Sequence, residues 1–224
     1  SMDACGKLAR SVKAHPQARE KGIRIVGIPK TIDNDLAITD HAPGFGSAAR
    51  YLASSVQELS QDVASLPIHV CIIESMGRNA GWLTAAAALA KTEEHVGPHL
   101  IYVPEVAFDE EQFLDEAKTL YKKYGGVVVV ASEGLRTKTG DPIVKPIFQV
   151  GRSVYYGDVS AHLCNLVIQK LGIKARSEKP GILGRCSIAF QSEVDCEEAI
   201  LVGKEAVKAM LEGKSEVMVG FERI

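Results

Sequence analysis

The stretch that decides the fold is IRIVGIPKTIDND, residues 23–35. Its first six residues are largely apolar, as in a buried strand, and a polar run with two carboxylates follows at once. In open α/β sheets ligands bind where strands end, so residues 29–35 are a candidate site for chemistry. In an extended chain Asp33 and Asp35 would face the same side, one acting as a base while the other organises its surroundings. The alternative is an Asx-rich turn that only ends the strand.

A second stretch, HVCIIESMGRNAGW at residues 69–82, has the same organisation. An apolar strand leads into a glycine-containing turn, and the turn leads into the helix-like run LTAAAALA at 83–90. A helix N-terminus offers free backbone N–H groups to an anion, and Arg78 beside it supplies a forked donor that matches phosphate. Gly77 lets the backbone approach a ligand closely. The alternative is a surface arginine at the start of a helix.

Bulk composition excludes several classes of protein. The 224 residues can form one large domain or two small ones, with 46% hydrophobic and 24% charged residues and a net charge of −2. Without a basic excess, and with only 6% aromatic residues, we expect no nucleic-acid partner. No apolar run is long enough to span a membrane. The five scattered cysteines form no CxxC motif or Cys/His cluster, which fits reduced cytoplasm and gives no metal ligand.

Apolar runs alternate with amphipathic stretches along the chain. The expected strands are 23–28, 69–74, 99–103, 126–131 and 216–221. The expected helices are 3–14, 46–64, 80–91, 110–123, 158–171 and 195–212. This alternation predicts an α/β fold built from βαβ units, with mostly parallel sheets and helices on both faces.

Local signals refine two parts of this assignment. Asp109 is the expected N-cap of the 110–123 helix, and the glycines that follow Tyr124 mark its end. Residues 135–157 contain a turn cluster and predict a hairpin or excursion that carries Arg136, Lys138, Lys145 and Arg152. Residues 173–195 mix Gly, Pro, Ser and charge, and we assign them no regular structure.

Together, PKTIDND and MGRxxGW resemble the 6-phosphofructokinase family, which carries both motifs in this order and about this far apart. Further matches are SEG at 132–134, GILGR at 181–185 and DxxEAxxVG at 195–203. The resemblance covers nearly the whole chain and implies Rossmann-like lobes. It also implies the glycolytic transfer of a phosphoryl group to the 1-hydroxyl of fructose 6-phosphate, with Mg²⁺ as cofactor.

The resemblance also implies roles for single residues. Asp33 would be the general base that takes the proton of the acceptor hydroxyl. The residues expected to contact fructose 6-phosphate are Thr31, Ile32, Asp33, Met76, Gly77, Arg78, Glu133 and Arg185. Structural alternatives stay open for several: a strand threonine, a core-edge carboxylate paired to Arg for Glu133, and a solvent-exposed Arg185. Glu74 is interpreted as holding Arg78 or a helix terminus rather than substrate.

Lys30 bears on the phosphoryl donor. Many family members carry Gly at this position, and Lys resembles the pyrophosphate-dependent branch, where an ammonium group neutralises donor phosphate. Some ATP-dependent members also carry Lys, so ATP remains the alternative donor. The residue after a Gly-Gly-Asp donor loop discriminates better, but in the family that loop lies upstream of the position of Ser1.

We therefore expect a truncated part of a longer enzyme, with residues 1–224 as the central and C-terminal part of its catalytic region. Residues 36–185, approximately, would form the sugar-phosphate-binding lobe, and the flanking segments would contribute to the donor lobe. The full-length protein is expected to be a cytoplasmic homo-oligomer. The other function classes are a non-catalytic sugar-phosphate-binding regulatory module and a structural fragment without a ligand.

Three positions depart from the family pattern. His69 stands where many members carry Arg, Ile188 replaces an expected phosphate-binding Arg, and Cys196 follows Asp195 where Arg is common. Histidine binds phosphate only when protonated, so a strand-start residue is the alternative interpretation of His69. The 6-phosphate pocket would then be completed by Arg185, by a neighbouring subunit, or by one of the basic residues Lys174, Arg176 and Lys179.

Overall fold

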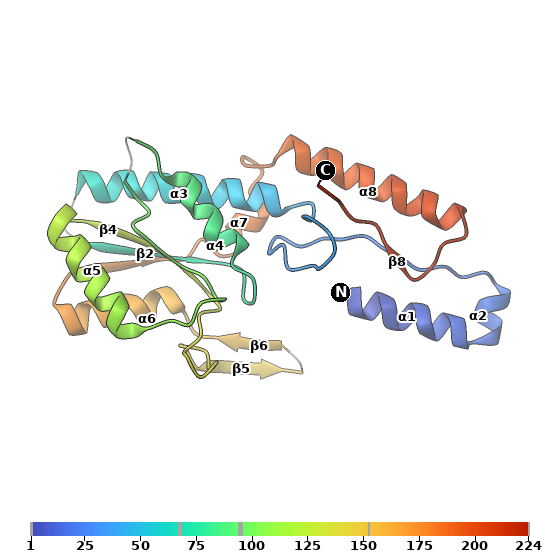
Figure 1. The fold of residues 1–224 in the computed structure, drawn as a ribbon, viewed down its shortest axis with the longest axis horizontal. Helices are drawn as coiled ribbons and strands as arrows, with labels where there is room; N and C mark the ends of the chain where they lie inside the picture. Colours follow the sequence, from blue (N-terminus) through green and yellow to red (C-terminus); the bar gives the residue numbers. More distant parts are fainter. Residues whose placement is uncertain (1, 67–68, 94–95, 152, 224) are drawn as a thin grey trace. The chain divides into compact units, whose positions relative to one another are not determined.

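A computed structural model describes residues 2–66, 69–93, 96–151 and 153–223. The chain divides into two compact units, one made of Ser1–Gly46 and Gln191–Ile224 and the other of Ser47–Phe190. Figure 1 shows the elements of each. The helix α3 (Phe45–Ser65) begins in the last residues of the first segment and continues in the second unit.

The second unit is built on a four-stranded sheet, as far as the described residues show. Its strands are β2 (Val70–Ser75), β3 (Leu100–Tyr102), β4 (Val127–Ser132) and β7 (Ala175–Glu178). The order is β3-β4-β2-β7 and every pairing is parallel, with Ile72 opposite Val129 at the centre. The prediction of an α/β fold with a parallel sheet is confirmed.

Helices cover both faces of this sheet, as Figure 1 shows. They are α3, α4 (Trp82–Ala86), the 3₁₀ segment η1 (Ala87–Ala90), α5 (Glu110–Tyr124), α6 (Val159–Leu166) and the π-helical segment η2 (Val167–Leu171). The unit also contains the short helix α7 (Leu183–Cys186). A separate antiparallel hairpin pairs β5 (Pro146–Val150) with β6 (Ser153–Tyr156). The hairpin expected within 135–157 is therefore confirmed, although Arg152 lies outside the described residues.

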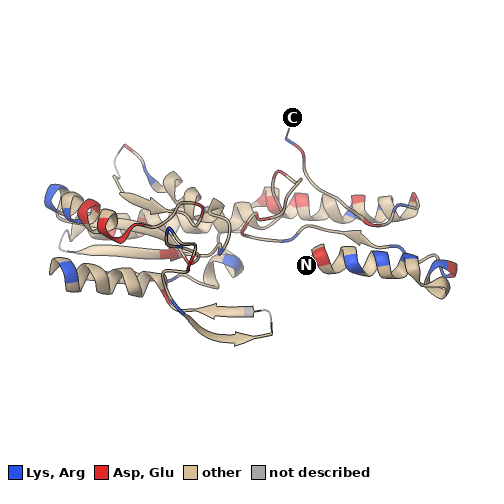
Figure 2. Ribbon diagram, turned by 60° about the horizontal axis from the view of Figure 1, so that its bottom comes forward, with Lys and Arg blue, Asp and Glu red and all other residues tan. Residues whose placement is uncertain are grey.

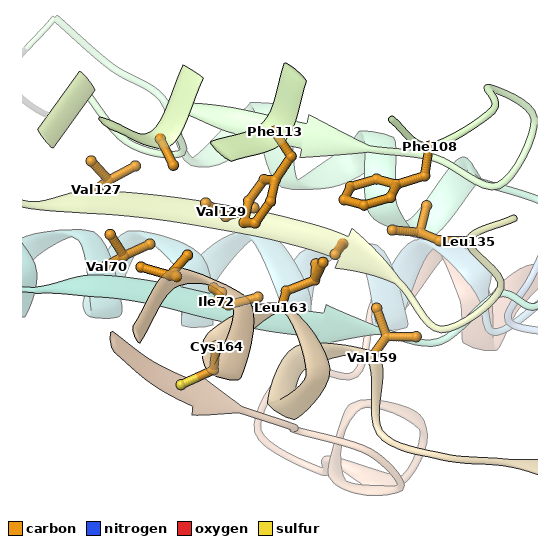
Figure 3. Packing of buried hydrophobic residues seen from close by; sticks show 13 residues of the cluster. Val70, Ile72, Phe108, Phe113, Val127, Val129, Leu135, Val159, Leu163 and Cys164 are labelled. Carbon is orange, nitrogen blue, oxygen red and sulfur yellow. The ribbon is translucent and has the colours of Figure 1, made fainter. Parts of the chain in front are cut away.

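The main core lies between the sheet and the helices α5 and α6 (Figure 3). Val127 and Val129 of β4 pack there with Phe113 of α5 and Leu163 of α6, all fully buried. Alternate strand residues face the other side of the sheet. On that side Gly97 lies close to both Val128 of β4 and Ser60 of α3. Because both faces are covered, β2 and β4 consist of continuous buried residues without polar alternation.

The ends of α5 follow the local signals in its sequence. Asp109 caps the helix by accepting a hydrogen bond from Gln112 N at 3.1 Å, and Gly125 ends it in the left-handed conformation with φ 76°. Figure 2 shows acidic residues toward the start of α5 and basic residues toward its end. This distribution complements the helix dipole.

The first unit contains α1 (Met2–Ala14), α2 (Pro16–Glu20), β1 (Val26–Gly27), α8 (Glu193–Leu211) and β8 (Val217–Met218). Its two short strands pair in parallel, Val26 opposite Val217 and Gly27 opposite Met218. The loop of residues 28–44 leads from β1 to α3. It carries the polar run of residues 29–35 with its two carboxylates, here termed the acidic run. Among the described residues, no helix is long and apolar enough to cross a membrane.

Several predicted bounds were wrong for identifiable reasons. The strand 23–28 shrinks to β1 and the strand 216–221 to β8, because each pairs with the other over only two positions. The helix predicted for 80–91 starts later, at Trp82, since the Gly81 N–H is bound by Glu105 instead of starting a helix earlier. The helix predicted for 158–171 changes from α to π geometry at Val167.

Three elements were missed: α2, β7 and α7. The strand β7 gave no apolar signal because it lies at the edge of the sheet, with Arg176, Ser177 and Glu178 exposed. Pairing with β2 alone makes it a strand. The helix α7 is a single turn that covers part of the GILGR motif, and Arg185 lies on it.

Candidate functional site

The acidic run in the first unit forms a turn and not an extended segment. Asn34 adopts φ 53°, in the left-handed region, which breaks the alternation that would have placed Asp33 and Asp35 on one face. The Thr31 hydroxyl accepts a hydrogen bond from Asp33 N at 3.1 Å and donates to Asp35 Oδ1 at 3.0 Å. Residues 31–35 thus form a turn as in the alternative interpretation, but the Thr31 hydroxyl holds it, and the role of Asp33 in the chemistry stays a prediction.

The side chains of this turn differ in exposure. Lys30 and Asp35 are exposed, whereas Thr31, Ile32 and Asp33 are half-buried. Lys30 is therefore exposed to solvent, and its ammonium group is accessible to a highly charged phosphoryl donor. Partial burial of Asp33 is compatible with a base, because a carboxylate must be accessible to the hydroxyl that it deprotonates.

The second unit brings four of the predicted residues together at the carboxyl ends of two adjacent strands. Met76, Gly77 and Arg78 follow β2, and Glu133 follows β4. Glu133 N donates to Ser75 O at 3.0 Å, and Glu133 Oε1 accepts from Gly77 N at 3.3 Å. In parallel sheets this edge is where ligands bind.

Two glycines permit this close approach. Gly77 has φ 114°, and a Cβ there would lie 2.5 Å from Ala80 O. A Cβ on Gly134 would overlap the carbonyl oxygen of Arg78. Ser132 joins the two loops, because its Oγ donates to Gly77 O at 2.8 Å and accepts from Gly134 N at 3.0 Å. Ser132 and Gly134 of the SEG motif therefore let the two loops pack closely, and the same motif supplies Glu133.

Arg78 lies against the hairpin. Its guanidinium sits 5.3 Å from the centre of the Tyr156 ring, a cation–π distance. Its Nε is buried and has no hydrogen-bond partner among the described residues. Beside it the helix α4 starts at Trp82, and Gly81 N just before it already donates to Glu105 Oε1 at 2.7 Å, so the expected anion site at this helix start stays a prediction without that N–H.

Glu74 is a buried carboxylate at the same edge, with a residue exposure of 4%. Its Oε1 lies 2.6 Å from Lys179 Nζ, and its Oε2 accepts from Ser160 N at 3.1 Å, at the start of α6. It thus holds a helix terminus, one of the two predicted options, and its cation is Lys179 and not Arg78. Asp158 caps the same helix through Ala161 N at 2.9 Å and lies 3.7 Å from Lys179 Nζ.

The pKa shifts in this cluster follow from burial and from pairing. Burial raises the pKa of Glu74, and the bonds from Lys179 and Ser160 N only partly offset it. Burial acts to lower the pKa of Lys179, but the bond to Glu74 and the charges of Glu74, Asp158 and Glu133 outweigh it and raise that pKa. Burial likewise acts to raise the pKa of Asp158, and hydrogen bonds from Ser160 and Ala161 bring it below the usual value.

Replacing Lys179 by Met is expected to lower the free energy of unfolding at neutral pH by about 1–3 kcal/mol, because Glu74 loses its cation while staying buried. The loss should shrink as the pH falls below 4.5, the ordinary carboxyl pKa, because Glu74 then becomes protonated in the unfolded chain as well as in the folded one. Denaturant titrations at several pH values measure both effects.

Lys170→Met, at an exposed lysine of η2, is the matched control and should change little. The double variant Glu74→Gln/Lys179→Met should recover much of the lost stability, since neither partner then carries a charge. A Lys179→Met protein as stable as the parent chain at pH 7 would contradict this role of the pair.

The structure also describes Arg185 and the three positions that depart from the family pattern. Arg185 is exposed on α7, and in the described part of the chain no hydrogen bond or ion pair joins it to the Met76–Arg78 loop or to Glu133. His69 is buried just before β2, and burial followed by the charge of Arg176 lowers its pKa, so it is a neutral strand-start residue. Ile188 is 88% exposed, and Cys196 accepts a hydrogen bond from Gln191 at 3.0 Å.

Sequence reasoning missed one cluster altogether. His41, in the loop after the acidic run, is bound by Glu198 of α8 and by Asp40. The available signal was the DxxE spacing at 195–198, which places both carboxylates on one face of a helix.

The described residues offer no ready-made metal site. The described residues contain no group of three or more His, Cys, Asp or Glu side chains that could hold a metal ion. The five cysteines are free, and Cys71 is a buried residue of β2. A divalent cation would therefore need ligands from a bound phosphate donor or from residues beyond those described.

Comparison with known proteins gives consistent matches. The family model described as Phosphofructokinase matches residues 2–210. A pyrophosphate–fructose 6-phosphate 1-phosphotransferase from Xanthomonas campestris pv. campestris is 41% identical over 233 residues, covering 100% of this chain and 54% of the relative. A sulfofructose kinase from Alkalicoccus urumqiensis is 40% identical over 210 residues, covering 92% and 54%.

A solved structure agrees with these matches. The pyrophosphate-dependent phosphofructokinase from Marinobacter aquaeolei superposes with a TM-score of 0.82 at 37% sequence identity, covering 100% of this chain and 52% of that one. The chain spans about half the length of the curated relatives that it matches.

Proposed function

The chain belongs to the phosphofructokinase family, and we propose that the whole protein transfers a phosphoryl group from pyrophosphate to the 1-hydroxyl of fructose 6-phosphate. The product is fructose 1,6-bisphosphate. The observation that carries the proposal is the gathering of Met76, Gly77, Arg78 and Glu133 at the carboxyl ends of β2 and β4. The names of two relatives, one curated and one of known structure, support pyrophosphate as donor.

In this proposal the second unit binds the sugar phosphate. Arg78 supplies a forked cation for an anionic group of the sugar, and Glu133 accepts hydrogen bonds from sugar hydroxyls. Gly77 has no side chain, so the ligand can approach the backbone closely there. Arg185, exposed on α7, adds a second cation for the 6-phosphate.

The acidic run supplies the chemistry. Asp33 takes the proton of the acceptor hydroxyl as its oxygen bonds to phosphorus, and Thr31 and Ile32 line the sugar beside it. Lys30, exposed ahead of the turn, offsets donor charge. Mg²⁺ would offset the remaining donor charge, although the described side chains include no group of three or more His, Cys, Asp or Glu that could hold a metal ion by themselves.

We place the whole protein in the cytoplasm and propose that it works as a homo-oligomer. Free cysteines fit a reduced compartment.

A coupled assay of the full-length protein tests the donor. With fructose 6-phosphate and Mg²⁺, we expect turnover with pyrophosphate and little with ATP. Lys30→Gly should raise the KM for pyrophosphate more than the KM for the sugar. Turnover with ATP alone would overturn the donor assignment, and turnover only with 6-sulfofructose would overturn the sugar assignment. Sugar binding without turnover by either donor would favour the regulatory module.

A further inference from the structure

The loop of residues 39–44, here termed the anchor loop, joins the acidic run to α3. Two carboxylates of α8 bind it. Glu198 Oε2 lies 2.7 Å from His41 Nε2, and Asp195 Oδ1 accepts from Gly44 N at 3.0 Å. Asp195 is buried with 8% exposure, and Glu198 lies three residues further along the same helix face. The middle of the anchor loop, at His41, and its end, at Gly44, are therefore fixed to α8.

The C-terminal segment binds the same loop from another direction. Asp40 N donates to Phe221 O at 2.8 Å, and Phe221 N donates to Thr39 Oγ1 at 3.0 Å. The His41 ring stacks on Phe221 with ring centres 4.8 Å apart and planes 7° from parallel. Arg223 Nη2 lies 3.2 Å from Asp40 Oδ2. The imidazole is thus confined by packing as well as by hydrogen bonds.

A direct bond connects the anchor loop to the acidic run. Asn34 Nδ2 donates to Asp40 O at 3.2 Å, and Asn34 is the residue that follows Asp33. The left-handed conformation of Asn34 sets the direction of the turn. Movement of Asp40 and His41 would therefore be transmitted to the backbone beside Asp33.

The protonation of His41 follows from its two partners. Nδ1 lies 2.9 Å from Asp40 Oδ2, while Nε2 faces Glu198. Ionised carboxylates only accept hydrogen bonds, so both ring nitrogens must donate, and only the imidazolium has two N–H groups. The charged groups facing the ring are Asp40 of the loop and Glu198 of α8, with Arg223 of the C-terminal segment behind Asp40.

We propose that His41, as an imidazolium bridging Asp40 and Glu198, is a positioning residue that holds the Asp33 turn in place for phosphoryl transfer. The proposal rests on the proposed function. It assigns the DxxE motif of α8 a role in the reaction through the anchor loop, and it makes that role dependent on pH.

The bridge is favoured at acidic pH. Burial acts to lower the pKa of His41, but the bonds to Asp40 and Glu198 outweigh burial and raise that pKa above 6.5. A raised histidine pKa stabilises the fold fully below the unfolded value and loses that contribution as the pH rises through the folded value. The bridge is therefore intact at mildly acidic pH and weakens on the alkaline side.

The test uses the full-length protein with ¹³C-labelled histidine, and the His41 signal is assigned by its loss in His41→Asn. We expect His41 to titrate above 6.5. Glu198→Gln should lower that pKa, since it removes one of two facing carboxylates. The alkaline limb of kcat should shift down in parallel, with the KM for fructose 6-phosphate nearly unchanged. Glu197→Gln, at an exposed neighbour on α8, should change neither.

Each outcome has a distinct meaning. An unshifted His41 pKa in the wild-type protein overturns the bridge. A pKa that falls in Glu198→Gln while the kcat profile stays in place overturns the positioning role. No turnover by the wild-type protein overturns the proposed function and the positioning role with it, whereas the titration still decides the bridge. If Glu198→Gln fails to fold, Asp40→Asn, which removes the other carboxylate facing the ring, supplies the same comparison.

Discussion

Replacing Asp33 by Asn in the full-length protein is expected to lower kcat for fructose 6-phosphate phosphorylation by about 10²–10⁴-fold, the usual contribution of a general base. The amide keeps the shape of the carboxylate but cannot accept the hydroxyl proton. Sugar-phosphate affinity, measured by calorimetry, should change little, because Met76, Gly77, Arg78 and Glu133 are untouched.

Asp35→Asn is the matched control within the same turn. Asp35 accepts the Thr31 hydroxyl, and an amide oxygen accepts it nearly as well, so kcat should fall far less. Loss of both turnover and sugar binding in Asp33→Asn would show that the residue shapes the site and is not a base. Full turnover would remove Asp33 from the chemistry.

Gly134→Ala is expected to have the largest effect on the second unit. The added Cβ would overlap the Arg78 carbonyl oxygen, so the loop after β2 must move away from the loop after β4. Overpacking of this kind costs about 1–3 kcal/mol, and the free energy of unfolding should fall by that amount. The KM for fructose 6-phosphate should rise by about tenfold or more, because losing 1.4 kcal/mol of binding is a tenfold change.

Gly203→Ala provides the contrast. Gly203 lies within α8, and a Cβ there would meet no atom within 4 Å. Alanine is the better helix former by up to about 1 kcal/mol, so this variant should be as stable as the parent or more stable. Denaturant titrations and KM measurements on both variants suffice. A Gly134→Ala protein that matches Gly203→Ala in stability and KM would refute the close packing of the two loops.

The parallel sheet of the second unit was predictable because the local sequence of its central strands indicates that they are buried on both faces. β2 and β4 are continuous apolar runs, and only burial on both faces stabilises such a strand. β7 could not be found in this way, since its side chains are exposed and its stabilisation comes from pairing with β2. The short β1 is limited by its partner β8, which no local pattern reveals.

In the candidate site, too, residues fixed by local sequence were predictable and residues fixed by contacts between distant segments were not. Gly77 was recognisable, because a glycine between a strand and an arginine indicates close backbone approach, and its φ of 114° agrees. The turn at Asn34 was undecided, since aspartate and asparagine suit both a strand end and an Asx turn. The pairing of Glu74 with Lys179 and of His41 with Glu198 depends on contacts between distant segments. Such contacts follow from the fold as a whole.

The central claim is phosphoryl transfer from pyrophosphate to the sugar, and ³¹P NMR of the full-length protein tests it most directly. With fructose 6-phosphate, pyrophosphate and Mg²⁺, we predict that the pyrophosphate signal falls while fructose 1,6-bisphosphate and orthophosphate appear in equal amounts. Adding those two products to fresh enzyme should regenerate pyrophosphate. Pyrophosphate that stays intact while the sugar phosphate binds, or that is hydrolysed without forming the bisphosphate, would contradict the account.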